Sequence, residues 1–180
     1  MDLSCTYHPA TRSELECIWS KNISASPADP RWPLWRREYL ALNADGLGRT
    51  FAAVIDGEPV GEVTLLLSPE CSAIGGRTAL ADGKDTANIN ALRVDAAHRG
   101  QGHSSRLVAC AEEWAAAHGI RTLTIGVDAC EARNRAIIRT GAIPGCCFPP
   151  LRTARKCCIM QRRSHHDRRH RRRHRHGGAH

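Results

Sequence analysis

A short basic turn rich in glycine, residues 99–104, is the part of the sequence best suited to bind a ligand. It reads Arg-Gly-Gln-Gly-His-Ser and joins a strand pattern that ends at Val94 to a helix pattern that follows at once. The N–H groups in the first turn of a helix have no partner within that helix, and glycine lets a ligand approach the backbone closely. Because a helix start also attracts negative charge, the turn is predicted to bind the phosphate groups of a cofactor.

Two common phosphate-binding motifs fit this turn poorly. A P-loop needs the sequence Gly-Lys-Ser/Thr, and the turn contains no lysine. A dinucleotide-binding turn has three spaced glycines and an acidic residue about 20 residues further on, whereas only Gly100 and Gly102 are present here. The cofactor is therefore expected to be held by another kind of strand–turn–helix unit.

The elements around the turn predict an α/β (α+β) fold with a mixed sheet in a single domain. The predicted helices are residues 11–23, 35–42, 104–118 and 131–139, and the predicted strands are residues 50–55, 60–67, 86–94 and 121–127. Asp56-Gly57 is a strong hairpin signal between the first two strands, and Ser104 or Ser105 can cap the third helix. The unit from 86 to 127 implies one parallel crossover, and 68–85 is expected to be a mobile surface loop.

The segment Leu92–Leu107, LRVDAAHRGQGHSSRL, closely resembles the acetyl-CoA signature of the GCN5-related N-acetyltransferases, the GNAT family. The core of that signature is Gln/Arg-x-x-Gly-x-Gly/Ala at a strand–helix junction, and Arg99, Gly102 and Ser104 occupy its three positions. Ser104 departs from the usual Gly or Ala, but its side chain is small. The resemblance covers about residues 50–137 and implies an acyl-CoA N-acyltransferase fold, a mostly antiparallel sheet flanked by helices.

The resemblance also implies the reaction and its cofactor site. An N-acetyltransferase of this family transfers an acetyl group from acetyl-CoA to a primary amine, which attacks the thioester directly. The residues implied to bind acetyl-CoA are Leu92, Val94, Arg99, Gly100, Gln101, Gly102, His103, Ser104 and Asn134. The turn would surround the pyrophosphate through backbone N–H groups, and Leu92 and Val94 would offer backbone groups to the pantetheine arm. The His103 side chain either contacts phosphate or simply occupies the first turn of the helix.

The reaction needs a group that takes a proton from the acceptor ammonium and one that protonates the leaving thiolate. Glu62, on the strand after the hairpin, is the candidate base, acting directly or through a water molecule. The alternative is that Glu62 is a solvated glutamate on a strand. Many members of the family carry a tyrosine that acts as the general acid in the helix after Asn134. Ile137 or Ile138 occupies that position in this chain, and neither side chain can donate a proton.

The sequence divides into a predicted N-acetyltransferase domain, residues 1–142, and a basic tail rich in Cys, Arg and His, residues 143–180, that is expected to be disordered. Residues 1–150 carry 15 Lys and Arg against 17 Asp and Glu, whereas residues 151–180 carry 11 against one. One T inserted before codon 138 permits the reading Tyr-Pro-His-Trp-Gly-Tyr-Thr-Arg, which resembles the family pattern. We therefore predict a one-base deletion near codon 138, the last strands missing or replaced, and impaired activity.

Several other features limit the functions that the sequence allows. No apolar run is long enough to span a bilayer, and the N-terminus is polar, so a cytoplasmic protein without membrane partners is expected. The nine cysteines include no C-x-x-C pair, so neither a disulfide framework nor a metal site is predicted. The acceptor is expected to be a small-molecule or peptide amine, and Trp32 and Trp35 either line its pocket or pack in the core.

Two alternatives to an active enzyme remain open from the sequence. The chain can be a catalytically impaired homologue that binds acyl-CoA without turnover. It can also bind polyanions through the basic tail, since Lys and Arg release counterions from nucleic acid. The sequence does not indicate an oligomeric state.

Overall fold

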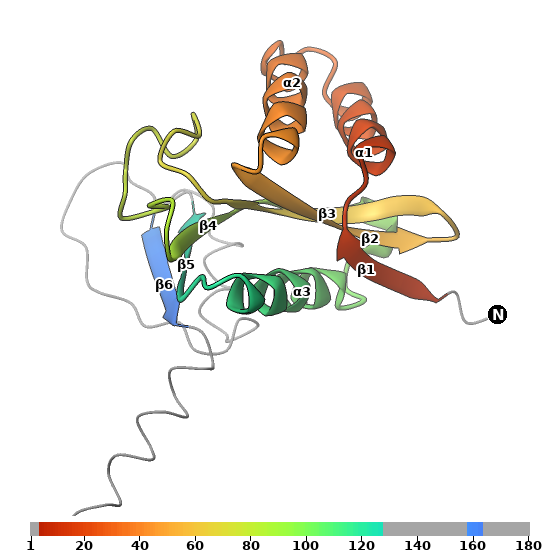
Figure 1. Cartoon of the computed structure of the whole chain (residues 1–180). Helices are drawn as coiled ribbons and strands as arrows, with labels where there is room; N and C mark the ends of the chain where they lie inside the picture. Colours follow the sequence, from red (N-terminus) through yellow and green to blue (C-terminus); the bar gives the residue numbers. More distant parts are fainter. Residues whose placement is uncertain (1–3, 128–157, 164–180) are drawn as a thin grey trace, which may run out of the picture.

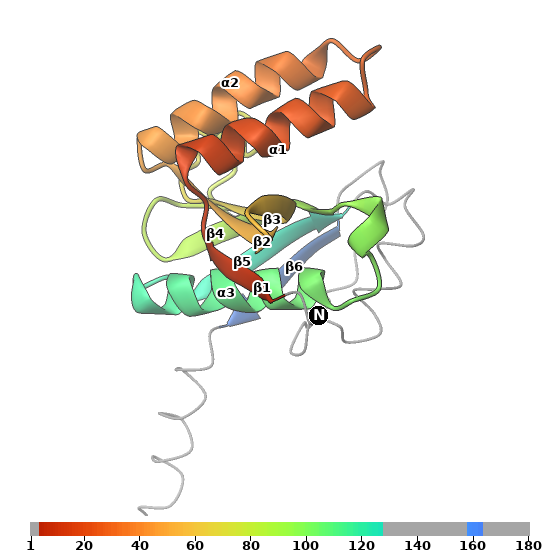
Figure 2. The same cartoon turned by 90° about the vertical axis from the view of Figure 1, so that its right-hand side faces the viewer.

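The computed structural model describes residues 4–127 and 158–163 of the chain. They form a six-stranded sheet in the order β1-β2-β3-β4-β5-β6, with α1 and α2 on one face and α3 on the other (Figure 1, Figure 2). The strands are β1 (Cys5–Pro9), β2 (Gly48–Ile55), β3 (Glu58–Leu66), β4 (Thr86–Val94), β5 (Thr122–Val127) and β6 (Cys158–Arg163). The helices are α1 (Arg12–Ala25), α2 (Arg31–Ala44) and α3 (His103–Ala117), with a 3-10 turn at Ala96–His98.

The sheet is mixed and mostly antiparallel, as predicted. Every neighbouring pair of strands is antiparallel except β4 and β5, which are parallel and are joined through α3. The elements predicted between residues 11 and 127 are present, with ends that differ by at most four residues. The edge strand β1 was not predicted, because its five residues carry no clear alternation. The helix predicted at residues 131–139 lies outside the described residues.

The hairpin between β2 and β3 confirms the turn signal at its tip. Asp56 has a φ of +51° and Gly57 a φ of +80°, so both central residues are left-handed. This is the conformation of a type I′ turn, which matches the twist of antiparallel strands and favours Asp-Gly. The turn pairs Ile55 with Glu58, and an irregularity between Ala53 and Val54 then shifts the register by one residue, which places Glu62 opposite Ala52.

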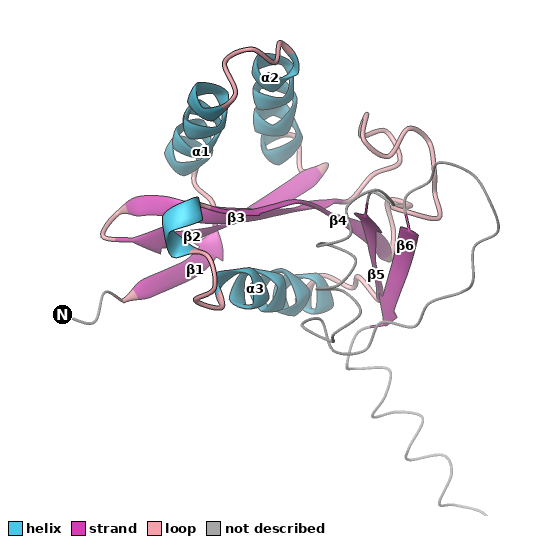
Figure 3. Cartoon of the chain, turned by 180° about the vertical axis from the view of Figure 1, so that it is seen from behind, coloured by secondary structure: helices cyan, strands magenta, loops and turns pink. Residues whose placement is uncertain are grey.

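Helices cover both faces of β2 and β3, which is why β3 is buried along nearly its whole length, including Glu62 and Thr64. On one face, Phe51, Val63 and Leu107 belong to a core between the sheet and α3 (Figure 3). On the other face, Trp19 and Leu42 belong to a core between the sheet and the pair α1 and α2. A strand buried on both sides reads as a continuous apolar run rather than as an alternating one.

The segment 68–85 is more than a surface loop, which corrects the prediction. It forms turns without a helix or strand, but Cys71, Ile74 and Leu80 are buried and pack against Tyr39 of α2. Its Gly, Ser and Ala content suggested exposure, while a few widely spaced apolar residues were enough to attach it to the core. The segment therefore closes the α2 face of the molecule at the end of the sheet.

β6 lies within the tail, residues 143–180, for which disorder was predicted. Its six residues pair with β5 in antiparallel fashion, from Thr122 with Arg163 to Val127 with Cys158. The rest of the tail lies outside the described residues, so the domain boundary at residue 142 stays a prediction. No helix in the described part of the chain is long and apolar enough to cross a membrane.

Candidate active site

The turn between β4 and α3 is shaped by two left-handed glycines. Gly100 has a φ of +80° and Gly102 a φ of +83°, and a Cβ built on either would meet no other atom within 4 Å. The glycines are therefore needed for their backbone conformation and leave open space beside the turn. Gly102 is the N-cap of α3 and makes no side-chain cap bond. The predicted cap at Ser104 or Ser105 is wrong, because α3 begins earlier, at His103.

This glycine cap leaves the start of α3 open to an acceptor. The first N–H to donate within the helix is that of Arg106, to the Gly102 carbonyl oxygen at 3.2 Å. The N–H groups of His103, Ser104 and Ser105 come before it, and no acceptor among the described residues is bonded to them. Three free donors at the positive end of a helix dipole suit a phosphate or pyrophosphate group.

β4 and β5 separate part-way along their length. Their parallel pairing ends at Ile89 with Ile125, although β4 continues to Val94. Leu92 and Val94, the residues implied to receive the pantetheine arm, lie in the half of β4 whose β5-facing edge has no strand partner among the described residues. An open strand edge can pair with an extended ligand as it would with another strand. This edge runs along β4 toward the turn at the start of α3.

β4 also contains a bulge beside this open edge. Between the pairs that Thr64 and Glu62 of β3 make with β4, β4 contains one residue more than β3. Ala91 lies in this stretch and has a φ of +50°, which is uncommon for a residue other than glycine. A bulge of this kind bends a strand and redirects its side chains, and bulges are frequent next to active sites.

Arg99 and Val94, both implied to bind the cofactor, contact each other. The Arg99 Nε donates a hydrogen bond to the Val94 carbonyl oxygen at 3.0 Å. Arg99 therefore stabilises the end of β4 as well as supplying charge beside the turn, where its side chain is exposed. Gln101 is exposed too, and its Nε2 donates to the Ala97 carbonyl oxygen at 3.4 Å.

The side chain of His103 points into the fold. It is buried, and its Nδ1 lies 2.6 Å from the Tyr7 hydroxyl oxygen on β1. Burial, followed by the positive charges of His98 and Arg106, lowers the pKa of His103 below its ordinary value. A neutral side chain that points into the fold favours a structural role for His103 in the first turn of α3 over contact between its side chain and a phosphate group.

Glu62 is buried and held by two neighbours. Only 1% of its surface is exposed, and its Oε1 accepts from the Arg93 Nε at 2.7 Å and from the Asn22 Nδ2 at 3.2 Å. Its Oε2 is buried and has no hydrogen-bond partner among the described residues. Burial raises the pKa of Glu62, while Arg93 opposes that rise. The alternative of a solvated strand glutamate is therefore wrong.

A small cavity lies beside Glu62. It has a volume of about 20 Å³. Its lining residues come from α1, the first half of β3, the end of β4 and the residue after β4: Ile18, Lys21, Asn22, Pro59, Gly61, Glu62, Arg93 and Asp95. That volume is sufficient for one water molecule, and the polar lining offers it partners. A water there would lie next to the buried carboxylate.

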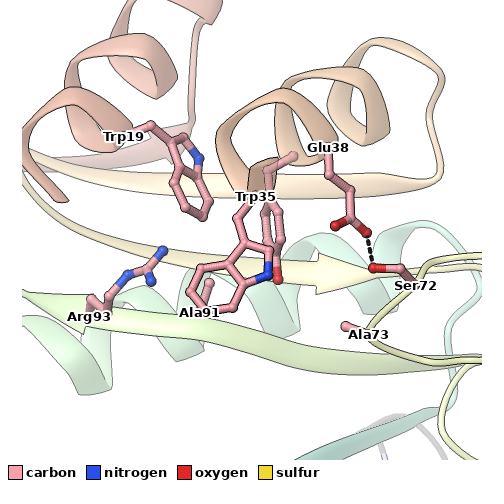
Figure 4. Close-up of a pocket in the computed structure, with 8 residues that line it drawn as sticks. Trp19, Trp35, Glu38, Ser72, Ala73, Ala91 and Arg93 are labelled. Carbon is pink, nitrogen blue, oxygen red and sulfur yellow. Dashed lines mark hydrogen bonds between the residues drawn. The ribbon is translucent and has the colours of Figure 1, made fainter. Parts of the chain in front are cut away.

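A larger cavity of about 400 Å³ opens on the α1 and α2 face of the sheet (Figure 4). Its lining residues come from α1, α2, the 68–85 segment and β4: Trp19, Trp35, Glu38, Tyr39, Ser72, Ala73, Ala91 and Arg93. Trp35 is thus a pocket residue, whereas Trp32 packs behind it, with ring centroids 5.2 Å apart. Arg93 borders both cavities and so connects the larger one with Glu62.

Residues 10–141 match the acetyltransferase (GNAT) family. The chain belongs to the GNAT acetyltransferase family. A GNAT-family protein from Desulfovibrio desulfuricans is 13% identical, with 89% of this chain and 99% of that chain covered and a TM-score of 0.68. Comparison with curated proteins found no similar sequence.

Two further solved structures share the fold and were determined with coenzyme A. The PaiA N-acetyltransferase of Thermoplasma acidophilum is 13% identical over 89% of this chain and 99% of that chain, with a TM-score of 0.62. The GNAT-family N-acetyltransferase YhbS of Escherichia coli is 15% identical over 93% of this chain and 85% of that chain, with a TM-score of 0.63. At these identities the likeness concerns the fold.

Some residues of this GNAT site were predicted and others were missed. The structure brings Leu92, Val94 and the turn 99–104 along one edge of β4, and it places Glu62 on the neighbouring strand β3, beside α1. Asn134, Ile137 and Ile138 lie outside the described residues. Arg93 was missed, because its contact with Glu62 follows from the pairing of the two residues across β3 and β4. No local motif marks that pairing before the register is known.

Proposed function

We propose that this GNAT-family chain transfers the acetyl group of acetyl-CoA to a primary amine by direct attack on the thioester. One observation carries the proposal: an open strand edge on β4 leads to an uncapped helix start on α3. The extended pantetheine arm of acetyl-CoA would lie along the strand edge, and the pyrophosphate that follows it would reach the helix start. The residues present therefore fit acetyl-CoA, which supplies the activated acetyl group and a thiol leaving group.

The cofactor side would act through backbone groups. The N–H groups at the start of α3 would bind the pyrophosphate, with Gly100 and Gly102 giving it room to approach. Leu92 lies where the unpaired edge of β4 can bond the pantetheine amides. Arg99 would add positive charge from the exposed side of the turn. Holding both reactants in place lowers the entropic part of the barrier.

Glu62 is the proposed general base. Its Oε1 is occupied by Arg93 and Asn22, so Oε2 is the atom available to receive a proton. A water in the small cavity would carry that proton from the acceptor ammonium to Oε2, leaving a neutral amine whose lone pair attacks the thioester carbon. Because burial raises the pKa of Glu62, its affinity for the proton is greater than that of an exposed glutamate.

The larger cavity is the proposed acceptor site. It lies on the α1 and α2 face, its wall includes Ala91 of the β4 bulge, and it shares Arg93 with the small cavity beside Glu62. An amine bound there would have the bulge on one side and the base nearby. The acceptor thus approaches from the face of the sheet opposite to α3.

The direct test is release of free thiol from acetyl-CoA in the presence of a panel of primary amines. Release that depends on both substrates is the expected result. A rise in melting temperature with CoA but no thiol release would contradict the proposed activity and support the impaired acyl-CoA-binding alternative. If CoA leaves the melting temperature unchanged, the cofactor site itself is wrong.

The tail carries separate proposals. We retain a one-base deletion near codon 138 as the origin of the basic tail, and the family match, which ends at residue 141, is consistent with it. Sequencing the gene across codons 130–150 tests this, and an in-frame gene without the shifted reading would disprove it. Salt-sensitive binding of polyanions by residues 151–180 and a cytoplasmic location also stay predictions.

A further inference from the structure

We infer that the acceptor is a small amine with a second positive charge, such as an alkyl diamine, whose distal ammonium group binds at Glu38. The inference rests on the proposed function for the acetyl transfer itself. It goes further by assigning a substrate class to the larger cavity and a specificity-determining role to Glu38, a residue of α2.

The first observation is a carboxylate without a counter-charge. Glu38 lies at one end of the cavity and Arg93 at the other (Figure 4). The Glu38 Oε1 accepts a hydrogen bond from the Ser72 Oγ, which fixes the carboxylate toward the 68–85 segment. No Lys, Arg or His nitrogen in the described part of the chain forms an ion pair with Glu38. A half-buried carboxylate in this position favours a cationic ligand group.

The second observation concerns the opposite end. The charge of Arg93 is already balanced by Glu62, whose Oε1 lies 2.6 Å from a terminal guanidinium nitrogen. The Arg93 guanidinium also stacks over Trp19, 4.9 Å from the ring centroid. With this pair neutral, the uncompensated charge of the cavity is negative and comes from Glu38. An acceptor that carries a carboxylate would therefore be disfavoured.

The third observation is the apolar wall between the two ends. Trp19, Trp35, Tyr39 and Ala91 line it, and Figure 4 shows Trp19 and Trp35 between Arg93 and Glu38. The Tyr39 hydroxyl donates to the Asn90 Oδ1 at 2.8 Å, so its polar atom is satisfied and its ring serves as wall. A chain of methylene groups suits such a surface, and aromatic rings also attract an ammonium group.

These observations place the two ends of the acceptor. The reacting amine would lie at the Arg93 end, next to Glu62, and the distal ammonium at the Glu38 end. A volume of about 400 Å³ is in the range of sites for small molecules. The cavity therefore favours the small-molecule amine over the peptide among the acceptors expected from the sequence.

The experiment compares three acceptors of similar length: 1,5-diaminopentane, pentylamine and 5-aminopentanoate. We expect kcat/KM for the diamine to exceed that for pentylamine by about 10-fold, and the amino acid to be the poorest. Glu38→Gln should lower kcat/KM for the diamine about 10-fold more than it lowers kcat/KM for pentylamine, so the preference for the diamine should be lost. Glu70→Gln, which makes the same charge change at an exposed position of the neighbouring segment, should preserve the preference.

Binding without acetyl-CoA separates this inference from the proposed function. Three of the four tryptophans lie in or behind the cavity, so their fluorescence should change on titration with 1,5-diaminopentane. Binding that Glu38→Gln weakens, with no acetylation of any amine, would support the cavity assignment and contradict the proposed function. Acetylation with equal kcat/KM for the diamine and pentylamine, or preference for 5-aminopentanoate, would overturn the inference and leave the function in place.

Discussion

The two ligand sites proposed beside β4 would recognise their ligands by different means. On the proposed cofactor side, the donors would be backbone N–H groups at the start of α3 and the open edge of the strand. On the proposed acceptor side, recognition and catalysis would depend on side chains such as Glu62, Arg93 and Glu38, which come from three different elements. A backbone site depends on local conformation, whereas a side-chain site depends on how distant elements pack.

This difference has a consequence for mutations. The cofactor side should tolerate changes of its exposed side chains but not of its left-handed glycines. The acceptor side should be sensitive to single side chains while its backbone stays as it is.

Glu62→Gln should have the largest effect. It keeps the shape and the bond to Arg93 but removes the base, so kcat is expected to fall by about 10²- to 10⁴-fold with CoA affinity unchanged. In the native protein, kcat/KM should fall with decreasing pH through a pKa above the ordinary glutamate value of 4.5, because only the deprotonated form accepts a proton. Steady-state kinetics across pH and calorimetry with CoA measure both quantities.

The matched control for that variant is Glu58→Gln. Glu58 is exposed on the same strand and pairs with Lys21 at 3.1 Å. Its kinetics should be close to native, since exposed ion pairs contribute little. Equal losses in both variants would show that Glu62 is not the base, and a weaker CoA affinity in Glu62→Gln would break the separation between the two sides.

On the proposed cofactor side of β4, Gly102→Val should weaken CoA binding more than a change of an exposed side chain in the turn. A β-branched residue disfavours the left-handed φ of +83°, so the turn must change and two or more phosphate bonds are lost. The dissociation constant for CoA is expected to rise on the order of 100-fold. Gly57→Val provides the control, with a φ of +80° at the hairpin tip and equally open space. An equal loss of CoA affinity in Gly102→Val and Gly57→Val would contradict a specific role of the Gly102 turn in CoA binding.

His103→Gln should change the pH dependence of stability. A buried histidine with a lowered pKa stabilises the fold above the ordinary value of about 6.5, and this contribution is lost as pH falls from there toward the folded pKa. The native melting temperature should therefore drop more between about pH 7.5 and 5.5 than that of the variant, which keeps a partner for Tyr7. His118→Gln, at the exposed end of α3, should behave as the native protein does. Parallel curves for all three proteins would refute this role of His103.

Gln101→Ala should have the smallest effect. The side chain is exposed, and within the described part of the chain its Nε2 donates a hydrogen bond of 3.4 Å to the Ala97 carbonyl oxygen. If the turn acts through its backbone, CoA affinity should stay within about threefold of the native value. A loss as large as that of Gly102→Val would mean that side chains, not backbone groups, hold the pyrophosphate.

The same contrast explains what the sequence predicted. The hairpin at Asp56-Gly57 and the turn at Gly100 and Gly102 could be located because each depends on residues that adopt a positive φ. The identity of Glu62 as a candidate was available too, but its burial was not, since burial depends on α1 and on Arg93 from another strand. The predicted cap at Ser104 or Ser105 was wrong for a local reason: the left-handed Gly102 is the N-cap, so the helix begins before either serine.

The acceptor cavity was beyond prediction for a physical reason. The sequence left two roles for Trp35, packing in the core or lining the acceptor pocket, and the composition of the 68–85 segment suggested that this segment is exposed. Ser72 reaches Glu38 across a separation of 34 residues, through a segment without helix or strand. Contacts of this kind depend on loop packing, which leaves no periodic pattern in the chain.

Ala91 borders both proposed ligand sites. Its left-handed backbone belongs to the bulge beside the open edge of β4, and its methyl group lines the proposed acceptor cavity. A larger residue at this position would alter the cavity and add strain to the bulge at the same time, so a change of acceptor specificity at β4 would also disturb the proposed cofactor-binding edge. The residues of α1, α2 and the 68–85 segment touch the acceptor side without that constraint. Evolution of new acceptor specificity on this scaffold would therefore proceed through the helices and the loop, with β4 as the slowly changing part.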